Sequence, residues 1–262
     1  MTVAGLPDSG TTTQLSPTSS LQRVSSALPS FCIALPVYNE AAVIESCIDN
    51  IARFLDTVDA RTGIIAVDDG SADNSFEVMC RMQDRLPQLV VHRHERNGGY
   101  GTANRTLCRL AADHQYDYAL VMDADGTQDP RYIENFFPLM CQGVDFIKAT
   151  RYRLGGGVDG VPWQRYVISR YGNLLARLVM DIPLSDFSNG FRAIRTEKWQ
   201  QIKSVERAFE LLIEECYVAK KLGFSFGEVP YILTARQEPG SESKFSYRWG
   251  VYRNYLRYVF KR

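Results

Sequence analysis

The sequence predicts an α/β protein with a mostly parallel central sheet covered by helices on both faces. From Phe31 onward, short apolar runs alternate with segments whose apolar residues recur at helical spacing. Strands that alternate with helices at these lengths form right-handed βαβ units, and such units build parallel sheets. The chain has 262 residues and is 45% hydrophobic, which is enough for a substantial core. Ligands of such sheets lie beyond the carboxyl ends of the strands.

The elements follow one another in a regular order. Apolar runs such as FCIALPV predict strands at 31–37, 63–69, 89–94, 118–125 and 144–151. Helical spacing predicts helices at 41–55, 74–86, 101–114, 131–142 and 208–223. Unusual polar residues follow four of the strands, in the stretches PVYNE, VDDGSADNS, MDADGTQD and ATRYRLGGG. We therefore expect these polar groups to converge on one cleft.

Two tails flank the predicted folded domain, which spans 31–242. Residues 1–30 are mostly Ser, Thr, Pro and Gly, and such a composition predicts a disordered tail without the pattern of a secretory signal. Residues 243–262 hold six basic groups, seven aromatic residues and no acid. A helix there would suit a membrane interface with anionic lipid. The alternative is an aromatic helix that packs on the catalytic domain.

Charge and cysteine content exclude several classes of protein. Lys plus Arg equals Asp plus Glu at 30 each, so no global field indicates nucleic acid as a partner. No apolar run approaches the roughly 18 residues that a spanning helix needs. The six cysteines form no CxxC pair, and we expect free thiols in a reducing cytosol. They are Cys32, Cys47, Cys80, Cys108, Cys141 and Cys216.

Asp123 and Asp125 are the strongest candidates for a metal site. Side chains at i and i+2 of an extended segment point the same way, so both carboxylates can face one cation. Mg²⁺ and Mn²⁺ prefer such oxygen ligands and commonly bridge carboxylates to substrate phosphates. A metal there would neutralise a diphosphate leaving group. The alternative is a pair of solvated turn aspartates.

Two further strand ends predict contacts with a nucleotide or sugar. Asp68 and Asp69 precede Gly70, whose missing Cβ allows a sharp turn, and a carboxylate there can hold a nucleobase or ribose. Glycines in RNGGYGTANRTL would let the backbone approach a diphosphate or sugar, although Gly-Gly is also ordinary turn chemistry.

Other polar residues at the strand ends have structural interpretations. Asp73 is better interpreted as a helix cap than as a ligand. His92 and His94 are interpreted as an exposed strand face rather than a metal site, because no third ligand is indicated.

The ordered series LPVYNE, VDDGSADNS, NGGYGTANR, DADGTQDP, DFSNGFR and EVP resembles the family 2 glycosyltransferases, which have the GT-A fold. The resemblance covers about Phe31 to Lys244. It implies a metal-dependent transferase that uses a nucleotide-diphosphate sugar. The donor-binding residues that it implies are Pro36, Tyr38, Glu40, Asp68, Asp69, Gly70, Asn97, Gly98, Asp123, Ala124 and Asp125.

The second half is similar to dolichol-phosphate mannose synthases and other polyprenyl-phosphate glycosyltransferases. The similar segments are RYRLGGGVDGVPWQRYVISRYGN and ARQEPGSESKF. In those enzymes the matching positions hold the lipid phosphate, and converging guanidinium groups can bind a phosphate bidentately. Here the positions are Arg151, Arg165, Ser169, Arg236 and Lys244. Arg151 and Arg165 are also expected to act in catalysis.

Two departures from the family pattern stand out. Relatives often have Gln two places beyond the second Asp, whereas this chain has Thr127 there and Gln128 one place later. The EPGSESKF stretch is longer than the compact GxSK of the synthases. The first departure concerns whether Gln128 binds the metal directly, and the second concerns the part that Lys244 plays in the acceptor loop.

These features predict an inverting transferase that moves mannose or another hexose from GDP or UDP to a polyprenyl phosphate. A phosphate acceptor is already anionic and needs no general base, whereas an alcohol would need Asp186 or Glu214 as the base. Asp186 is alternatively a cap, and Glu214 an exposed helix residue. We expect a cytoplasmic protein that attaches peripherally to the membrane. A transferase for a small soluble acceptor and a non-catalytic nucleotide-sugar-binding subunit are the alternatives.

Overall fold

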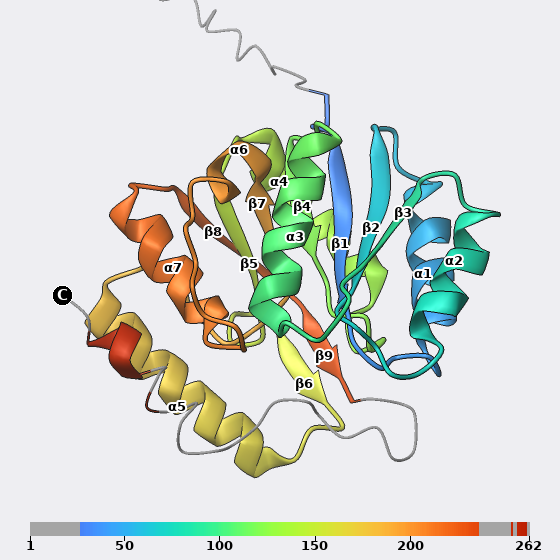
Figure 1. Cartoon of the computed structure of the whole chain (residues 1–262). Coiled ribbons are helices and arrows are strands. Elements are labelled where there is room, and N and C mark those ends of the chain that lie inside the picture. Colours follow the sequence, from blue (N-terminus) through green and yellow to red (C-terminus); the bar gives the residue numbers. More distant parts are fainter. Residues whose placement is uncertain (1–26, 236–252, 254–255, 261–262) are drawn as a thin grey trace, which may run out of the picture.

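The computed structural model of the chain describes residues 27–235, 253 and 256–260 (Figure 1). Its centre is a seven-stranded sheet with the strand order β3-β2-β1-β4-β7-β5-β8. Only β7 runs antiparallel to its neighbours, β4 and β5; the other neighbouring pairs in this sheet are parallel. The seven strands are β1 (Phe31–Val37), β2 (Thr62–Asp68), β3 (Leu89–Arg93), β4 (Tyr118–Val121), β5 (Phe146–Thr150), β7 (Arg192–Arg195) and β8 (Phe226–Pro230).

Helices cover both faces of this sheet, as the sequence predicts. They are α1 (Ile44–Leu55), α2 (Ser75–Gln83), α3 (Tyr100–Asp113), the 3₁₀ helix η1 (Pro130–Phe136), α4 (Phe137–Cys141), α6 (Thr196–Trp199) and α7 (Leu211–Lys221). A further helix, α5 (Trp163–Met180), reaches the core only with its C-terminal end. A second, two-stranded sheet pairs β6 (Gly157–Asp159) in parallel with β9 (Ile232–Thr234). The prediction of a mostly parallel α/β fold is confirmed.

Alternate residues of the central strands enter two separate cores. Ile33 and Leu35 of β1 pack in the core that contains α1, α2, η1 and α4. Cys32 and Ala34 of the same strand pack in the core that contains α3, α6, α7 and the end of α5. All four side chains are fully buried, so truncation of Ile33 or Leu35 to Ala would cost about 2–5 kcal/mol. This two-sided burial explains why the strands are continuously apolar.

Two predicted elements differ from the observed ones. The strand expected at 118–125 ends at Val121, and the following DADG stretch is a turn. The helix expected at 131–142 is divided into η1 and α4, because Pro138 at the start of α4 lacks an N–H for a continuous helix. The early end of β4 matters for the site, because the turn places residues 123–128 at the carboxyl edge of the sheet.

Helix α5 lies away from the central sheet, along the edge of the molecule beside β6 (Figure 1). Several of its large apolar side chains are exposed: Trp163, Ile168, Tyr171, Leu174, Leu175, Leu178 and Val179. None of the helices in the described part of the chain is long and apolar enough to cross a membrane.

Candidate active site

One cavity of about 690 Å³ lies beyond the carboxyl ends of β1, β2, β4 and β5. Segments far apart in the sequence meet there because parallel strands end at the same edge of a sheet. Of the predicted site residues, those that line it are Pro36, Tyr38, Glu40, Asp69, Asn97, Asp123, Ala124, Asp125, Arg151 and Ser169. Asp68, Gly70 and Gly98 are not among the lining residues. The Arg165 side chain, Arg236 and Lys244 lie outside what the structure describes.

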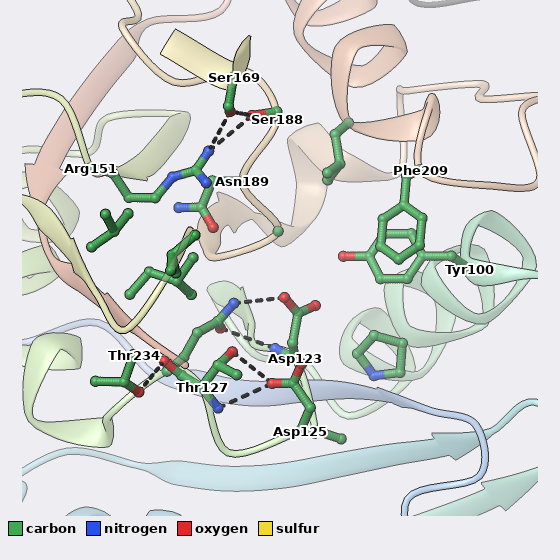
Figure 2. Close-up of a pocket in the computed structure, with 18 of the residues that line it drawn as sticks. Tyr100, Asp123, Asp125, Thr127, Arg151, Ser169, Ser188, Asn189, Phe209 and Thr234 are labelled. Carbon is green, nitrogen blue, oxygen red and sulfur yellow. Dashed lines mark hydrogen bonds between the residues drawn. The ribbon is translucent and has the colours of Figure 1, made fainter. Parts of the chain in front are cut away.

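The turn after β4 orients both predicted metal carboxylates. Gln128 donates from Nε2 to Asp123 Oδ2 at 2.8 Å, and its Oε1 accepts from the Asp123 N–H at 3.0 Å. Thr127 donates to Asp125 Oδ1 from its hydroxyl at 2.7 Å and from its N–H at 3.1 Å. Figure 2 shows these bonds around Asp123 and Asp125. Thr127 and Gln128 therefore position the carboxylates from the same turn.

The donor set fits a hard divalent cation. Asp123 and Asp125 both line the cavity, and their oxygens are the ligands that Mg²⁺ and Mn²⁺ prefer. No cluster of three or more His, Cys, Asp or Glu residues suited to a metal is present among the described residues. Two carboxylates leave coordination positions for water and substrate phosphates, which is the usual arrangement for a metal that bridges protein and diphosphate.

Asp69 lines the end of the cavity that lies nearest to β2 and β3. Its Oδ1 accepts from the Gly98 N–H at 3.0 Å and lies 2.7 Å from His94 Nδ1, while its Oδ2 accepts from the Gly99 N–H at 2.7 Å. The interpretation of His94 as part of an exposed strand face is wrong, because its side chain is only 15% exposed. The second ring nitrogen, Nε2, lies 2.9 Å from the Thr106 hydroxyl of α3. His94 therefore connects Asp69 to α3.

Neighbours of Asp69 have structural contacts instead. Asp68 is fully buried, accepts from the Ser71 N–H at 3.2 Å and pairs with Arg93 at 3.3 Å. Gly70 has a φ of 69°, and a Cβ on it would collide with the backbone of Arg96. Asp73 accepts from the Ser75 N–H at the start of α2, as expected of a capping side chain. These residues shape the turn that presents Asp69.

Arg151 lies at the other end of the cavity, after β5. It binds Asp186 through Nε at 2.7 Å and through Nη2 at 2.8 Å, so its bidentate partner is a carboxylate of the protein. Nη2 also donates to the Ser188 hydroxyl at 2.9 Å and approaches that of Ser169 at 3.5 Å. Tyr152 donates to Ser169 at 2.7 Å. The predicted phosphate residues Arg151 and Ser169 are thus adjacent, within a group of hydroxyl groups.

The ion pair with Arg151 keeps Asp186 ionised at this end of the cavity. Burial alone would raise the pKa of Asp186, but the charge and hydrogen bonds of Arg151 outweigh burial and hold the pKa below its ordinary value. A carboxylate of low pKa that is bound to a guanidinium is a poor proton acceptor. Asp186 therefore positions Arg151 and does not fit the role of a general base.

Glu214 does not face the cavity either. It is 3% exposed and accepts from the N–H groups of Val205 and Glu206 and from the Tyr258 hydroxyl. Neither prediction for Glu214, a general base or an exposed helix residue, is right. Tyr258, from the basic aromatic C-terminal segment, is buried against the catalytic domain through this contact.

Several lining residues escaped the sequence analysis. Tyr100, from NGGYGTANR, stacks on Phe209 with ring centroids 4.8 Å apart, and both line the cavity. Ser188 and Asn189, from DFSNGFR, line it beside Arg151. Their motifs were recognised, but nothing local in the sequence indicates which of their side chains turn inward. Phe209 lies outside the recognised motifs.

Comparisons with known proteins agree with this architecture. Residues 32–202 match the sequence profile described as "Glycosyl transferase family 2". The chain belongs to this family. As a family 2 glycosyltransferase, it is a transferase, as the sequence predicts. Its six cysteines are free thiols, which also agrees with the sequence analysis.

This family 2 glycosyltransferase is similar in sequence to two polyprenyl-phosphate mannosyltransferases. The chain is 28% identical over 210 residues to the polyprenol monophosphomannose synthase of Mycolicibacterium smegmatis, covering 78% of this chain and 77% of the relative. It is 27% identical over 215 residues to the undecaprenyl-phosphate mannosyltransferase of Micrococcus luteus, covering 81% and 86%. The predicted resemblance to polyprenyl-phosphate glycosyltransferases is confirmed.

A solved structure shares the fold. Glucosyl-3-phosphoglycerate synthase from Mycobacterium tuberculosis, in complex with Mn²⁺, UDP and phosphoglyceric acid, superposes with a TM-score of 0.60 at 22% identity. The match covers 82% of this chain and 72% of that chain. It supports the predicted GT-A fold of this family 2 glycosyltransferase.

Proposed function

We propose that this family 2 glycosyltransferase moves a hexosyl group from a nucleotide-diphosphate sugar to a polyprenyl phosphate, with inversion at the anomeric carbon. The observation that carries the proposal is one cavity lined by a carboxylate pair, Asp123 and Asp125, and by a guanidinium–hydroxyl group, Arg151 and Ser169. The first pair suits a metal-bound diphosphate, and the second suits a phosphate acceptor. Two named relatives act on polyprenyl phosphates.

In this proposal Asp123 and Asp125 hold Mg²⁺ or Mn²⁺, which supplies charge neutralisation for the departing diphosphate. Thr127 and Gln128 keep the two carboxylates in place through the hydrogen bonds within the turn. Asp69 and Asn97, which also line the cavity, are our proposed contacts to the nucleoside of the donor. Preorganised groups of this kind stabilise the transition state because they need no reorganisation when charge develops.

At the other end, Arg151 offers guanidinium N–H groups, and the ion pair with Asp186 fixes their orientation. The hydroxyl groups of Ser169 and Ser188 add hydrogen-bonding capacity around it. A phosphate oxygen is already anionic near neutral pH, so no general base is needed. Arg165, Arg236 and Lys244 remain our proposed further contacts to this phosphate.

A lipid acceptor also needs an apolar path from the cavity. Val158 of β6 and Leu233 of β9 line the cavity, together with Ile168 and Leu175 of α5. Ile168 and Leu175 are also exposed, at 53% and 38%. The cavity wall therefore continues into the apolar surface of α5. We propose that this surface contacts a membrane while the polyprenyl chain follows the apolar wall.

Transfer is tested by incubating the protein and Mn²⁺ or Mg²⁺ with labelled GDP-mannose or UDP-glucose and an acceptor. With undecaprenyl or dolichyl phosphate, label should enter the organic phase. With 3-phosphoglycerate, it should not enter a soluble product. Label on the soluble acceptor alone would overturn the lipid assignment. Nucleotide-sugar binding without turnover on either acceptor would indicate a non-catalytic binding subunit.

Membrane contact is tested with the double variant Leu174→Ser, Leu178→Ser and vesicles that contain anionic lipid. Both side chains are exposed on α5, at 48% and 72%, so the changes should spare the fold. Binding should weaken about a hundredfold, since each Leu side chain contributes about 1.5 kcal/mol when buried in lipid and the double variant loses about 3 kcal/mol. The matched control is Leu222→Ser, which is 45% exposed just after α7. Equal vesicle binding by the wild type and the double variant would contradict the role of α5.

A further inference from the structure

Tyr100 and Phe209 form an aromatic wall inside the cavity. Their rings stack with centroids 4.8 Å apart and an interplanar angle of 22°. Figure 2 shows the stacked pair across the cavity from Arg151. We propose that the transferred sugar ring packs on this aromatic wall, so that Tyr100 and Phe209 determine which hexose the enzyme accepts. The inference rests on the proposed function and names the part of the donor that this wall contacts.

The Phe209 side of the wall is fixed by contacts with the start of α3. Gly99 has a φ of 90°, and a Cβ on either Gly99 or Gly101 would collide with the backbone of Arg207 or Glu206. The Gly101 N–H donates to Arg207 O at 2.8 Å, and Arg105 Nη1 donates to Glu206 O at 3.0 Å. These glycines admit a segment of the protein itself, where the sequence had indicated close approach of a diphosphate or sugar. The segment before Phe209 is therefore held against α3.

The Tyr100 side of the wall reaches the metal-site carboxylates. A Cβ on Gly190 would lie 2.9 Å from Asp123 Oδ1 and 3.0 Å from the Tyr100 hydroxyl oxygen, so both groups border one small space. Arg192 Nη1 donates to the Tyr100 hydroxyl at 3.4 Å. The phenol hydroxyl of Tyr100 is a hydrogen-bond donor at this position and can donate to a sugar hydroxyl.

The position of the wall favours the sugar over other parts of the substrates. Asp69, Asn97, Asp123 and Asp125 all line the cavity, and in the proposed function the first two face the nucleoside and the last two face the diphosphate. The sugar is bonded to that diphosphate, and its anomeric carbon must face an acceptor held near Arg151. The wall borders this space on the side away from Arg151 (Figure 2). One face of a pyranose presents C–H groups with partial positive charge, which pack well on the electron-rich face of an aromatic ring.

The test compares ligands with and without the sugar. Titration calorimetry would measure the affinities of UDP-glucose, GDP-mannose, UDP and GDP, each with Mn²⁺, for the wild type and for Phe209→Ala, Phe209→Leu and Tyr100→Phe. Phe209→Ala should weaken the preferred nucleotide sugar roughly threefold to tenfold and leave its free diphosphate unchanged. Phe209→Leu should show the same selective loss. Tyr100→Phe keeps the ring and removes only the hydroxyl, so its loss of affinity for the nucleotide sugar should be smaller than that of Phe209→Ala and should again be absent for the free diphosphate.

Phe226→Leu is the matched control. Phe226 also pairs with another ring, Phe146, but it does not line the cavity, so its replacement should leave both affinities unchanged. If Phe209→Ala fails to fold, as judged by circular dichroism, Phe209→Leu decides the outcome.

Equal losses for sugar-bearing and sugar-free ligands would overturn the inference, because the wall would then contact the nucleotide. The transfer assay would also measure the KM of the variants for the acceptor. A change confined to that KM would overturn the inference as well and would assign the wall to the lipid. A wild-type protein that binds no nucleotide sugar would instead refute the proposed function. Normal wild-type binding with unaltered variants would refute only the aromatic wall.

Discussion

The two ends of the cavity differ in how far apart in the sequence their interacting residues lie. At the metal end, Asp123 and Asp125 are oriented by Gln128 and Thr127, which are five and two residues away. At the acceptor end, Arg151 contacts Asp186, 35 residues away, and Ser188, 37 residues away. The metal end is one turn with its own hydrogen bonds, whereas the acceptor end exists only in the folded protein. Substitutions at the metal end should lower the rate of transfer. Substitutions at the acceptor end should lower both the rate of transfer and the stability of the fold.

Asp125→Asn should give the largest loss of activity. The substitution removes a charge from the proposed metal site while Thr127 can still bond to the side chain, so the fold should be retained. Transfer should fall by about a thousandfold, an effect typical of losing one group that stabilises developing charge. Release of nucleoside diphosphate across a Mn²⁺ titration measures it. The control is Asp129→Asn in the same turn region, where Asp129 caps η1. Full activity in Asp125→Asn would refute the metal assignment.

Asp186→Asn should act mainly on stability. Breaking the buried pair with Arg151 leaves an uncompensated charge, which costs about 3–5 kcal/mol. The pKa of Asp186 is lower in the folded protein than its ordinary value of 3.8, so the ion pair stabilises the native state above that pH. Urea unfolding should therefore show a constant difference between wild type and variant at neutral and mildly acidic pH. The difference should shrink only as the pH falls below about 4. A difference that disappears near pH 6 would contradict this ion-pair role.

His94→Ala should weaken donor binding by about tenfold, because Asp69 would lose a partner 2.7 Å away that helps to orient its carboxylate. His94→Asn can restore a donor near the position of Nδ1 and should recover part of the affinity. The readout is the KM for the nucleotide sugar set against kcat. An unchanged KM with a reduced thermal midpoint would indicate that His94 acts on stability alone.

Ser169→Ala should have the smallest effect. Its hydroxyl accepts from Tyr152 and lies 3.5 Å from Arg151, so its loss should raise the KM for polyprenyl phosphate about threefold and leave donor binding unchanged. Ser46→Ala on α1 is the control, since Ser46 is exposed and does not line the cavity. An equal change in donor and acceptor KM would show that Ser169 does not belong to a separate acceptor end.

The sequence by itself determined the α/β class and its order of elements, because two-sided burial of parallel strands leaves continuous apolar runs such as FCIALPV. It also determined the Asp123/Asp125 pair, whose supporting residues lie within the same turn. Only the tertiary structure decided that Asp69 rather than Asp68 lines the cavity and that Arg151 is already bound to Asp186. It also placed Phe209 against Tyr100. The physical reason is distance along the chain, because contacts between residues tens of positions apart leave no local pattern. The packing of α3 and α7 against the sheet fixes which side chains turn inward.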